Sequence, residues 1–408
     1  MDDLERRAPV QPGSIVLLAA ALMIAGLVMI ASARASIDRS LFSTSIWESI
    51  FGRQAVFVAV GMTALVGTRH FAPLVLASPA LRFRVSLIAY LLVLTCLVVA
   101  LIPGVGSPQR GSQRWLQVTA YHGGLGFQPS ELAKLTLIAF LAALAANRGT
   151  ATRSLRHGLL VPAAATGIYC VLVSKEDFGT GLLLAAVGAC ILLVAGYKFR
   201  HLLMLAAVGA GVFLVLLFAA PYRVARLSAY RDIWADQQGG GYQPLQSLTA
   251  IAQGGWFGTG LGAGIHKYGY LPEGHSDFIF ALICEETGLV GAVLVMALFC
   301  GFIYMGARTM WAAQTQFEQI LAFGITAAVT LQAAMNIAVV TVVLPTTGIS
   351  LPFVSAGGSG LLVYSVAAGV LAAIASRGRA HILVSGRSGQ SCAHDGGLGL
   401  VGQEVAAW

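Results

Sequence analysis

This 408-residue sequence contains unusually few charged residues. Asp, Glu, Lys and Arg make up 10% of the residues and 57% are hydrophobic, whereas soluble proteins typically contain about 25% charged residues. So little charge excludes a soluble enzyme with an ordinary polar surface. In a membrane protein, the net charge of +8 reflects the Lys and Arg residues that set its orientation and contact anionic lipid. It does not indicate a nucleic-acid partner.

Cysteine is also scarce, and the common metal and nucleotide motifs are missing. Five of the six cysteines fall within long apolar runs and Cys392 lies near the C-terminus, so neither a disulfide framework nor a zinc site is predicted. The glycine-rich run from Gly258 to Gly264 lacks G-x-x-x-x-G-K-[ST] and follows no evident strand, which argues against a nucleotide-binding loop. We expect these glycines to allow a sharp bend or the close approach of a bulky ligand.

Long apolar runs are abundant. Crossing a hydrocarbon core of about 30 Å takes about 20 apolar residues, and ten runs near that length are separated by polar or Gly/Pro-containing breaks. The first run is too long for a signal peptide and no A-x-A-like cleavage site follows it. We predict an all-α polytopic membrane protein of about ten transmembrane helices, at residues 13–33, 54–71, 84–103, 127–147, 158–174, 178–197, 201–221, 278–306, 320–344 and 359–376.

An even number of helices places both termini on the same side of the membrane. Lys and Arg are more frequent in the segments on the side of the N-terminus than in the short loops opposite, which predicts that both termini are cytoplasmic. The expected organisation is a cytoplasmic segment 1–12, a transmembrane domain 13–376 with a large extracytoplasmic loop 222–277 between helices seven and eight, and a tail 377–408. Because the tail is glycine-rich and polar, we expect it to be cytoplasmic and disordered.

Charged residues also occur inside the apolar runs, where an isolated charge is costly. In FQPSELAK (127–134), Glu131 and Lys134 are spaced i, i+3 and can pair on one helix face. The pair either holds helices together or brings Lys134 to an anionic substrate group. In KEDFGTGLL (175–183), Asp177 can cap the next helix, a role worth about 1 kcal/mol that is compatible with a functional role.

Two arginines beside a tryptophan lie in the short outer loop before residue 127. Arg110, Arg114 and Trp115 are either anchors at the membrane interface or a site for pyrophosphate, because planar guanidinium groups bind phosphate oxygens in pairs. The sequence leaves both interpretations open.

The decapeptide LPEGHSDFIF (271–280) precedes the eighth predicted helix. Asp277 is the last charged residue before the apolar run, and a carboxylate at the edge of hydrocarbon calls for a functional reason. Glu285 and Glu286 follow by eight and nine residues, so one of them shares a helix face with Asp277; we favour hydrogen bonding to neighbouring helices for them. The uncharged segment 336–360 is rich in Gly, Pro and hydroxyl residues, which predicts a re-entrant or surface-lying lid.

Six segments in this order resemble those of the SEDS family (shape, elongation, division and sporulation), which includes FtsW, RodA and SpoVE. They are GSQRW (111–115), FQPSELAK (127–134), EDFGTGLL (176–183), GYQPLQSLTAI (241–251), LPEGHSDFIFALICEETGLVGA (271–292) and LPTTGISLPFVSAGGSGLL (344–362). The resemblance covers nearly the whole chain except its two ends. It is closer to the FtsW and SpoVE branch than to RodA, although Ala356 and Gly360 stand where relatives usually have tyrosine and serine.

This resemblance implies an inverting glycosyltransferase that polymerises lipid II into β-1,4 glycan strands at the outer face of the bacterial cytoplasmic membrane, for division or cell shape. It maps the family's essential aspartate to Asp277, which would accept the proton of the attacking sugar hydroxyl. The expected partners are lipid II, membrane lipid and a class B penicillin-binding protein that acts as transpeptidase. The alternatives are a lipid II flippase and a scaffold that only activates the transpeptidase, but the polar motifs cluster near the outer ends of the helices, which favours the enzyme.

The leaving pyrophosphate calls for cationic and polar groups close to Asp277. No metal site made by protein residues alone is predicted, and a Mg²⁺ or Mn²⁺ ion held mainly by the pyrophosphate is compatible with the sequence. The predicted substrate-binding residues are Lys134, Glu131, Arg114, Arg110, Asp177 and His275.

Overall fold

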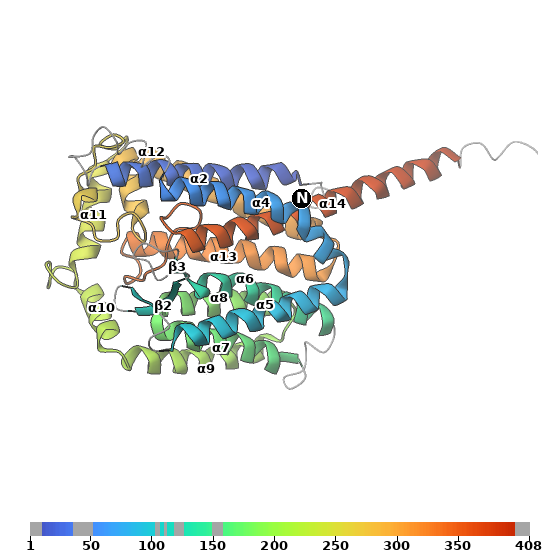
Figure 1. Ribbon diagram of the computed structural model, residues 1–408, viewed down its shortest axis with the longest axis horizontal. Coiled ribbons are helices and arrows are strands. Elements are labelled where there is room, and N and C mark those ends of the chain that lie inside the picture. Colours follow the sequence, from blue (N-terminus) through green and yellow to red (C-terminus); the bar gives the residue numbers. More distant parts are fainter. Residues whose placement is uncertain are drawn as a thin grey trace, which may run out of the picture.

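The computed structural model describes residues 10–35, 52–102, 107–109, 112–117, 126–148 and 158–395. These residues form a bundle of long helices whose axes are roughly aligned and whose chain directions run both ways (Figure 1). The helices are α2 (Pro12–Ala35), α4 (Arg53–Ala77), α5 (Pro79–Ala100), α6 (Pro129–Arg148), α7 (Leu160–Glu176), α8 (Phe178–Val194), α9 (Phe199–Phe218), α10 (Pro221–Arg231), α11 (Tyr242–Gly254), α12 (Ile279–Ala312), α13 (Gln316–Val340) and α14 (Gly358–Asp395).

The predicted all-α membrane fold is confirmed. Ten of the described helices, namely α2, α4 to α9 and α12 to α14, coincide in order with the ten predicted spans. Eight of them are long and apolar enough to cross a membrane. The other two, α7 and α8, have 17 residues each and pack against one another inside the same bundle.

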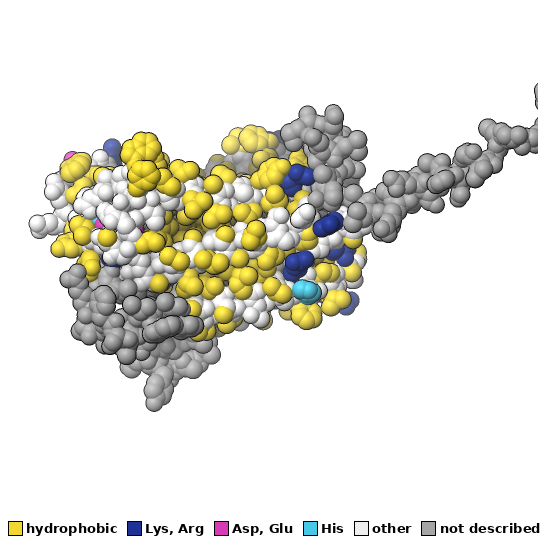
Figure 2. Space-filling view, turned by 90° about the horizontal axis from the view of Figure 1, so that it is seen from above, with side chains coloured by type: hydrophobic (Ala, Val, Ile, Leu, Met, Phe, Trp, Pro, Cys, Tyr) yellow, Lys and Arg dark blue, Asp and Glu magenta, His cyan; other side chains and the backbone are white. Residues whose placement is uncertain are grey.

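The core of the bundle is formed by α6, α13 and α14. In α6 and α14, 78% and 72% of the apolar stretch is buried inside the protein, compared with 6% in α9. Exposed apolar side chains on the outer helices therefore mark the surface that faces lipid. Figure 2 shows hydrophobic side chains along the flank of the bundle, with Lys and Arg side chains gathered near the end from which α14 leaves.

The opposite end of the bundle carries the irregular and short elements. These are a small antiparallel sheet of order β1-β2-β3, the helices α10 and α11 across the end of the bundle (Figure 1), and the 3₁₀ helix η4 (His266–Tyr268). The strands are β1 (Ser107–Gln109), β2 (Ser112–Gln117) and β3 (Gly126–Phe127). The predicted large loop 222–277 thus contains most of α10, together with α11 and η4, none of which the apolar runs indicated.

Two helices differ from their predicted form. The helix α12 has a non-helical residue at Gly288, with φ 67° and ψ −165°, a conformation that is essentially restricted to glycine. The helix α14 continues to Asp395 instead of ending at residue 376, so the first part of the segment expected to be a disordered tail is helical. Residues 396–408 lie outside the described residues.

Candidate functional site

A polar cavity lies at the end of the bundle that carries the sheet, α10 and α11. It encloses about 780 Å³ of empty space, part of which is open to solvent. Its walls come from the starts of α6, α8 and α14, from the middle of α13 and from the segment between α13 and α14. The polar side chains that line it include Gln128, Glu131, Asp177, Thr180, Ser276, Asp277, Gln332, Ser350, Ser355, Ser359 and Tyr364.

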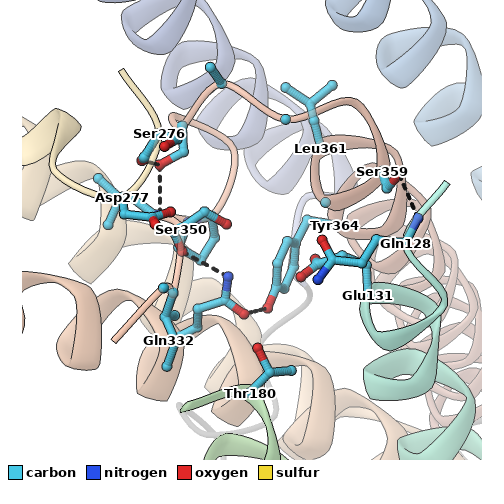
Figure 3. Close-up of a pocket in the computed structure, with 18 of the residues that line it drawn as sticks. Gln128, Glu131, Thr180, Ser276, Asp277, Gln332, Ser350, Ser359, Leu361 and Tyr364 are labelled. Atoms are coloured by element: carbon cyan, nitrogen blue, oxygen red, sulfur yellow. Dashed lines mark hydrogen bonds between the residues drawn. The ribbon is translucent and has the colours of Figure 1, made fainter. Parts of the chain in front are cut away.

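Asp277 lies in the cavity wall, two residues before α12, and is half-buried. Its backbone is fixed from two directions: its N–H donates to Glu273 O at 3.1 Å, and its carbonyl accepts from Asn336 Nδ2 at 2.7 Å. Figure 3 shows Asp277 on the opposite side of the cavity from Glu131. The residue predicted to be catalytic therefore faces a space that can hold a polar substrate group.

The predicted lid is an irregular segment that is bound to the chain around Asp277. Ser355 Oγ donates to Ser276 O at 2.6 Å, and Ala356 N donates to His275 O at 3.0 Å. Phe353 has a positive φ of 64°, a backbone conformation that residues other than glycine adopt at a cost of order 1–3 kcal/mol. These contacts make the lid and the Asp277 segment a single wall. Two backbone carbonyls of the lid also bond to side chains of α13: Ser350 O accepts from Gln332 Nε2 and Ile349 O accepts from Asn336 Nδ2.

Behind the opposite wall, Lys134 is paired with Glu131 as the i, i+3 spacing predicted. Lys134 Nζ lies 2.8 Å from Glu131 Oε2 and 2.7 Å from Gln332 Oε1, and 4.9 Å from the centre of the Tyr364 ring. The Tyr364 hydroxyl donates to Gln332 Oε1, and Gln332 Nε2 donates to Ser350 O (Figure 3). Lys134 is only 2% exposed and is not one of the lining residues, so it contacts the cavity wall from behind, through the lining residues Glu131, Gln332 and Tyr364, and Glu131 compensates its charge.

Asp177 has the capping role that the sequence predicted and also lies in the cavity wall. Its Oδ1 accepts from Thr180 N at 3.0 Å, which makes it the N-cap of α8, and it also lines the cavity. Three carboxylates, Glu131, Asp177 and Asp277, thus line one cavity. Over the described part of the chain, no three His, Cys, Asp or Glu side chains are close enough together to hold a metal ion.

The remaining predicted site residues are placed less directly. Arg110 lies outside the described residues, and of Arg114 only the backbone is described, as part of β2. Trp115, the next residue, lines the cavity. His275 is half-buried and accepts the lid's hydrogen bond through its backbone carbonyl, but it is not a lining residue.

Glu285 and Glu286 lie away from the cavity and hold the glycine-rich loop against α12. Glu285 Oε1 accepts from Ile265 N at 2.7 Å and lies 2.9 Å from His266 Nδ1. Glu286 pairs with Lys267 at 2.8 Å and also accepts from Ser32 Oγ on α2. The expectation that these carboxylates bond to neighbouring helices is confirmed for Glu286, which bonds to α2, whereas Glu285 bonds to the loop and to the 3₁₀ helix η4.

Sequence reasoning missed three residues that build the site: Gln332, Asn336 and Tyr364. Gln332 and Asn336 are both 1% exposed and lie four residues apart on α13. Two amides at i, i+4 inside an apolar run share a helix face, and that spacing was a usable signal. Tyr364 carried no such signal, because a single tyrosine on an apolar helix is common.

The fold and the cavity define a class of protein: a polytopic membrane protein with an acidic, partly enclosed site at one end of its helical bundle. The chain belongs to the FtsW/RodA/SpoVE family of cell cycle proteins, whose sequence model matches residues 13–380. This confirms the predicted family. The chain is 36% identical over 355 residues to the "Probable peptidoglycan glycosyltransferase FtsW" of Legionella pneumophila, which covers 86% of this chain and 87% of that protein.

A second relative and two solved structures agree with this family. "Stage V sporulation protein E" of Bacillus subtilis is 35% identical, with 88% of this chain and 94% of that protein covered. A chain from the structure "Structural coordination of polymerization and crosslinking by a peptidoglycan synthase complex" matches with a TM-score of 0.70 and 24% identity, over 89% of this chain and 97% of that one. The rod shape determining protein RodA of Thermus thermophilus matches with a TM-score of 0.63 and 23% identity, over 89% and 95% of the two chains. These structural matches show that the fold is shared.

Proposed function

We propose that this protein is a peptidoglycan glycosyltransferase that polymerises lipid II at the outer face of the bacterial cytoplasmic membrane. The observation that carries the proposal is the position of Asp277 in the wall of a polar cavity at one end of a membrane bundle. The relative from Legionella pneumophila carries the name of the same activity, which supports the proposal. A lipid-anchored sugar is held at the membrane surface by its tail, and a cavity at the end of the bundle opens at that level.

Asp277 is the proposed general base. The sugar 4-hydroxyl of one substrate attacks the anomeric carbon of the other; the hydroxyl proton passes to the Asp277 carboxylate, and the bond to the lipid pyrophosphate breaks. A positioned base contributes about 10²–10⁴-fold to such a step. Because the donor is α-linked and the product β-linked, one inverting displacement suffices. The fixed backbone of Asp277 suits this role, since its N–H and carbonyl are both hydrogen-bonded.

The leaving pyrophosphate needs positive charge around it. In this proposal Arg110 and Arg114, in the loop next to Trp115, bind its oxygens, while the buried cation Lys134 compensates the charge of Glu131 and orients Gln332 in the cavity wall. A Mg²⁺ or Mn²⁺ ion held mainly by the pyrophosphate would take one carboxylate of the cavity wall as a further ligand, because Mg²⁺ usually takes one or two carboxylates together with substrate phosphates. Such an ion would neutralise part of the leaving group's charge.

The finer cellular assignments also belong to this proposal. Both termini are cytoplasmic, so the cavity opens outward and the large loop 222–277 is extracytoplasmic. A class B penicillin-binding protein is the partner that cross-links the new strands, in keeping with the synthase complex whose chain shares this fold. The activity serves cell division or cell shape.

The test is polymer formation from lipid II by the purified full-length protein with its transpeptidase partner. Asp277→Asn is expected to abolish polymer while leaving partner binding unchanged, because the amide keeps the shape of the side chain but cannot accept the proton. Asp236→Asn is the matched control, because it makes the same chemical change in an exposed turn of the loop 222–277, where the Asp236 carboxylate accepts from Gly239 N and Gly240 N. This variant should polymerise lipid II normally.

Three outcomes would contradict the proposal. Undiminished polymer from Asp277→Asn would remove Asp277 from the chemistry. If the native protein makes no polymer but moves lipid II across vesicle bilayers, the flippase is the correct function. If it does neither and still stimulates the transpeptidase, it is a scaffold.

A further inference from the structure

The glycine-rich loop between α11 and η4 carries large apolar side chains that the protein leaves uncovered. Trp256 is 71% exposed, Phe257 82% and Leu261 62%. Three such side chains within six residues form a patch that is costly to leave in water. The position of this loop relative to the bundle indicates what covers the patch.

The loop packs on α12 at the break in that helix. Leu289 N donates to Gly255 O at 3.0 Å, and Val290 N donates to Trp256 O at 3.2 Å. The part of α12 that follows, residues 289–312, is about 36 Å long at 1.5 Å per residue, which is enough to cross a hydrocarbon core of about 30 Å. Trp256 therefore lies beside the first residues of the membrane-crossing part of α12.

Contacts with a second membrane-spanning helix, α2, place the loop at the same depth relative to the membrane. Glu286 accepts from Ser32 Oγ at 2.6 Å and from Gly262 N at 3.2 Å. Ser32 lies in the last turn of α2, whose apolar span is Pro12–Ala33. The loop is thus bound at the point where two membrane-spanning helices reach the cavity end of the bundle.

The exposed side chains of the loop are continuous with the flank of the bundle that faces lipid. Directly after the break, α12 exposes an apolar stripe made of Leu289, Val290, Val293 and Leu294. A helix that crosses a membrane presents such a stripe to acyl chains. Because Trp256 is hydrogen-bonded to Val290 through its backbone, the patch extends this stripe past the end of the span.

We propose that Trp256, Phe257 and Leu261 insert into the lipid bilayer at the cavity end of the bundle, at the boundary between acyl chains and headgroups. Tryptophan is enriched at this boundary because its ring is apolar and its N–H can bond to polar groups there. The Glu285 and Glu286 contacts transmit this anchoring from the loop to α12 and α2. The proposal concerns the lipid contact alone and does not depend on the enzymatic function.

Spin-label accessibility in phospholipid nanodiscs tests the insertion. The full-length chain, with its six native cysteines replaced by serine or alanine, carries a nitroxide at Phe257→Cys. Val293→Cys is the control within the lipid-facing stripe, and Gln238→Cys is the control at an exposed polar position. We expect oxygen to relax the label at residue 257. We also expect the accessibility of this label to a water-soluble nickel complex to be at least fivefold lower than that of the label at residue 238.

Two results would overturn the insertion: nickel access at residue 257 equal to that at residue 238, which places the patch in water, or exclusion of both reagents, which means that protein covers it. A second measurement covers the case that the cysteine-free chain does not fold. In nanodiscs with brominated acyl chains, bromine should quench a larger fraction of the tryptophan fluorescence of the native protein than of Trp256→Phe. The variant lacks the tryptophan that the proposal places in the lipid at this loop. Equal fractional quenching of the two would also refute the proposal.

Discussion

Lys134 is a residue at which burial and charge oppose each other. A buried ammonium group is stable only if it is paired and hydrogen-bonded, and Glu131 and Gln332 satisfy both conditions. Removing one partner of such a pair typically costs about 3–5 kcal/mol, because the other charge is left buried and unpaired. We therefore predict that Lys134→Met strongly lowers the thermal unfolding temperature of the protein in detergent.

The double variant Glu131→Gln/Lys134→Met is the control for this prediction, since it removes both charges. It should recover much of the lost stability, because no unpaired charge remains. If the single and double variants unfold at the same temperature, the pair is not coupled and the network around Gln332 carries the stability instead.

Gly26 on α2 allows that helix to touch the backbone of the lid. A Cβ placed there would lie 2.4 Å from Val354 O and 2.7 Å from Val354 Cα, and a backbone cannot move aside as a flexible side chain can. We predict that Gly26→Ala destabilises the protein by about 1–3 kcal/mol, the usual cost of overpacking, and lowers polymer formation by shifting the lid. Gly13→Ala on the same helix, where a Cβ would meet nothing within 4 Å, should change neither measurement. Equal thermal stability of the two variants would contradict this view of the lid.

Gly288 determines how α12 is built. With φ 67° and ψ −165°, any other residue is strained by about 1–3 kcal/mol, and a Cβ would lie 2.4 Å from Gly258 N. Gly288→Ala should therefore displace the glycine-rich loop and increase hydrogen exchange in residues 255–268. Gly209→Ala on α9 has open space around it and should leave that exchange unchanged. An unchanged exchange pattern in Gly288→Ala would mean that the loop does not depend on the break.

Long apolar helices were predictable, and irregular elements were not. An apolar run indicates a helix such as α6 or α9 directly, because hydrocarbon requires internal hydrogen bonding. The break at Gly288 leaves no trace in hydropathy, since glycine occurs in many membrane helices. The basic helix α10 was hidden inside a polar loop, where Arg223 binds Ser174 O and Lys175 O, contacts that only the fold creates.

The same distinction holds for the site. Glu131, Asp177 and Asp277 could be found because each is a charge at the end of an apolar run. Gln332 and Tyr364 enter the site only through tertiary packing, which brings α13 and α14 against α6. The sequence therefore predicted the acidic groups of the cavity, and the structure adds the neutral groups that hold Lys134 behind the wall.

The proposed orientation of the whole molecule in the membrane is a prediction from the distribution of Lys and Arg. The end opposite the cavity carries Arg84, Lys198, Arg200, Arg308 and Arg377 on helix ends and short turns, and Lys and Arg in short connections favour the cytoplasmic side. Single cysteines in a cysteine-free chain report the orientation. Gln238→Cys, at the cavity end, should react with a membrane-impermeant maleimide in intact spheroplasts. Lys198→Cys, which is exposed at the other end, should react only after permeabilisation. The reverse pattern would place the cavity in the cytoplasm, where a polymerase of exported lipid II has no substrate, and would refute the proposed function together with the orientation.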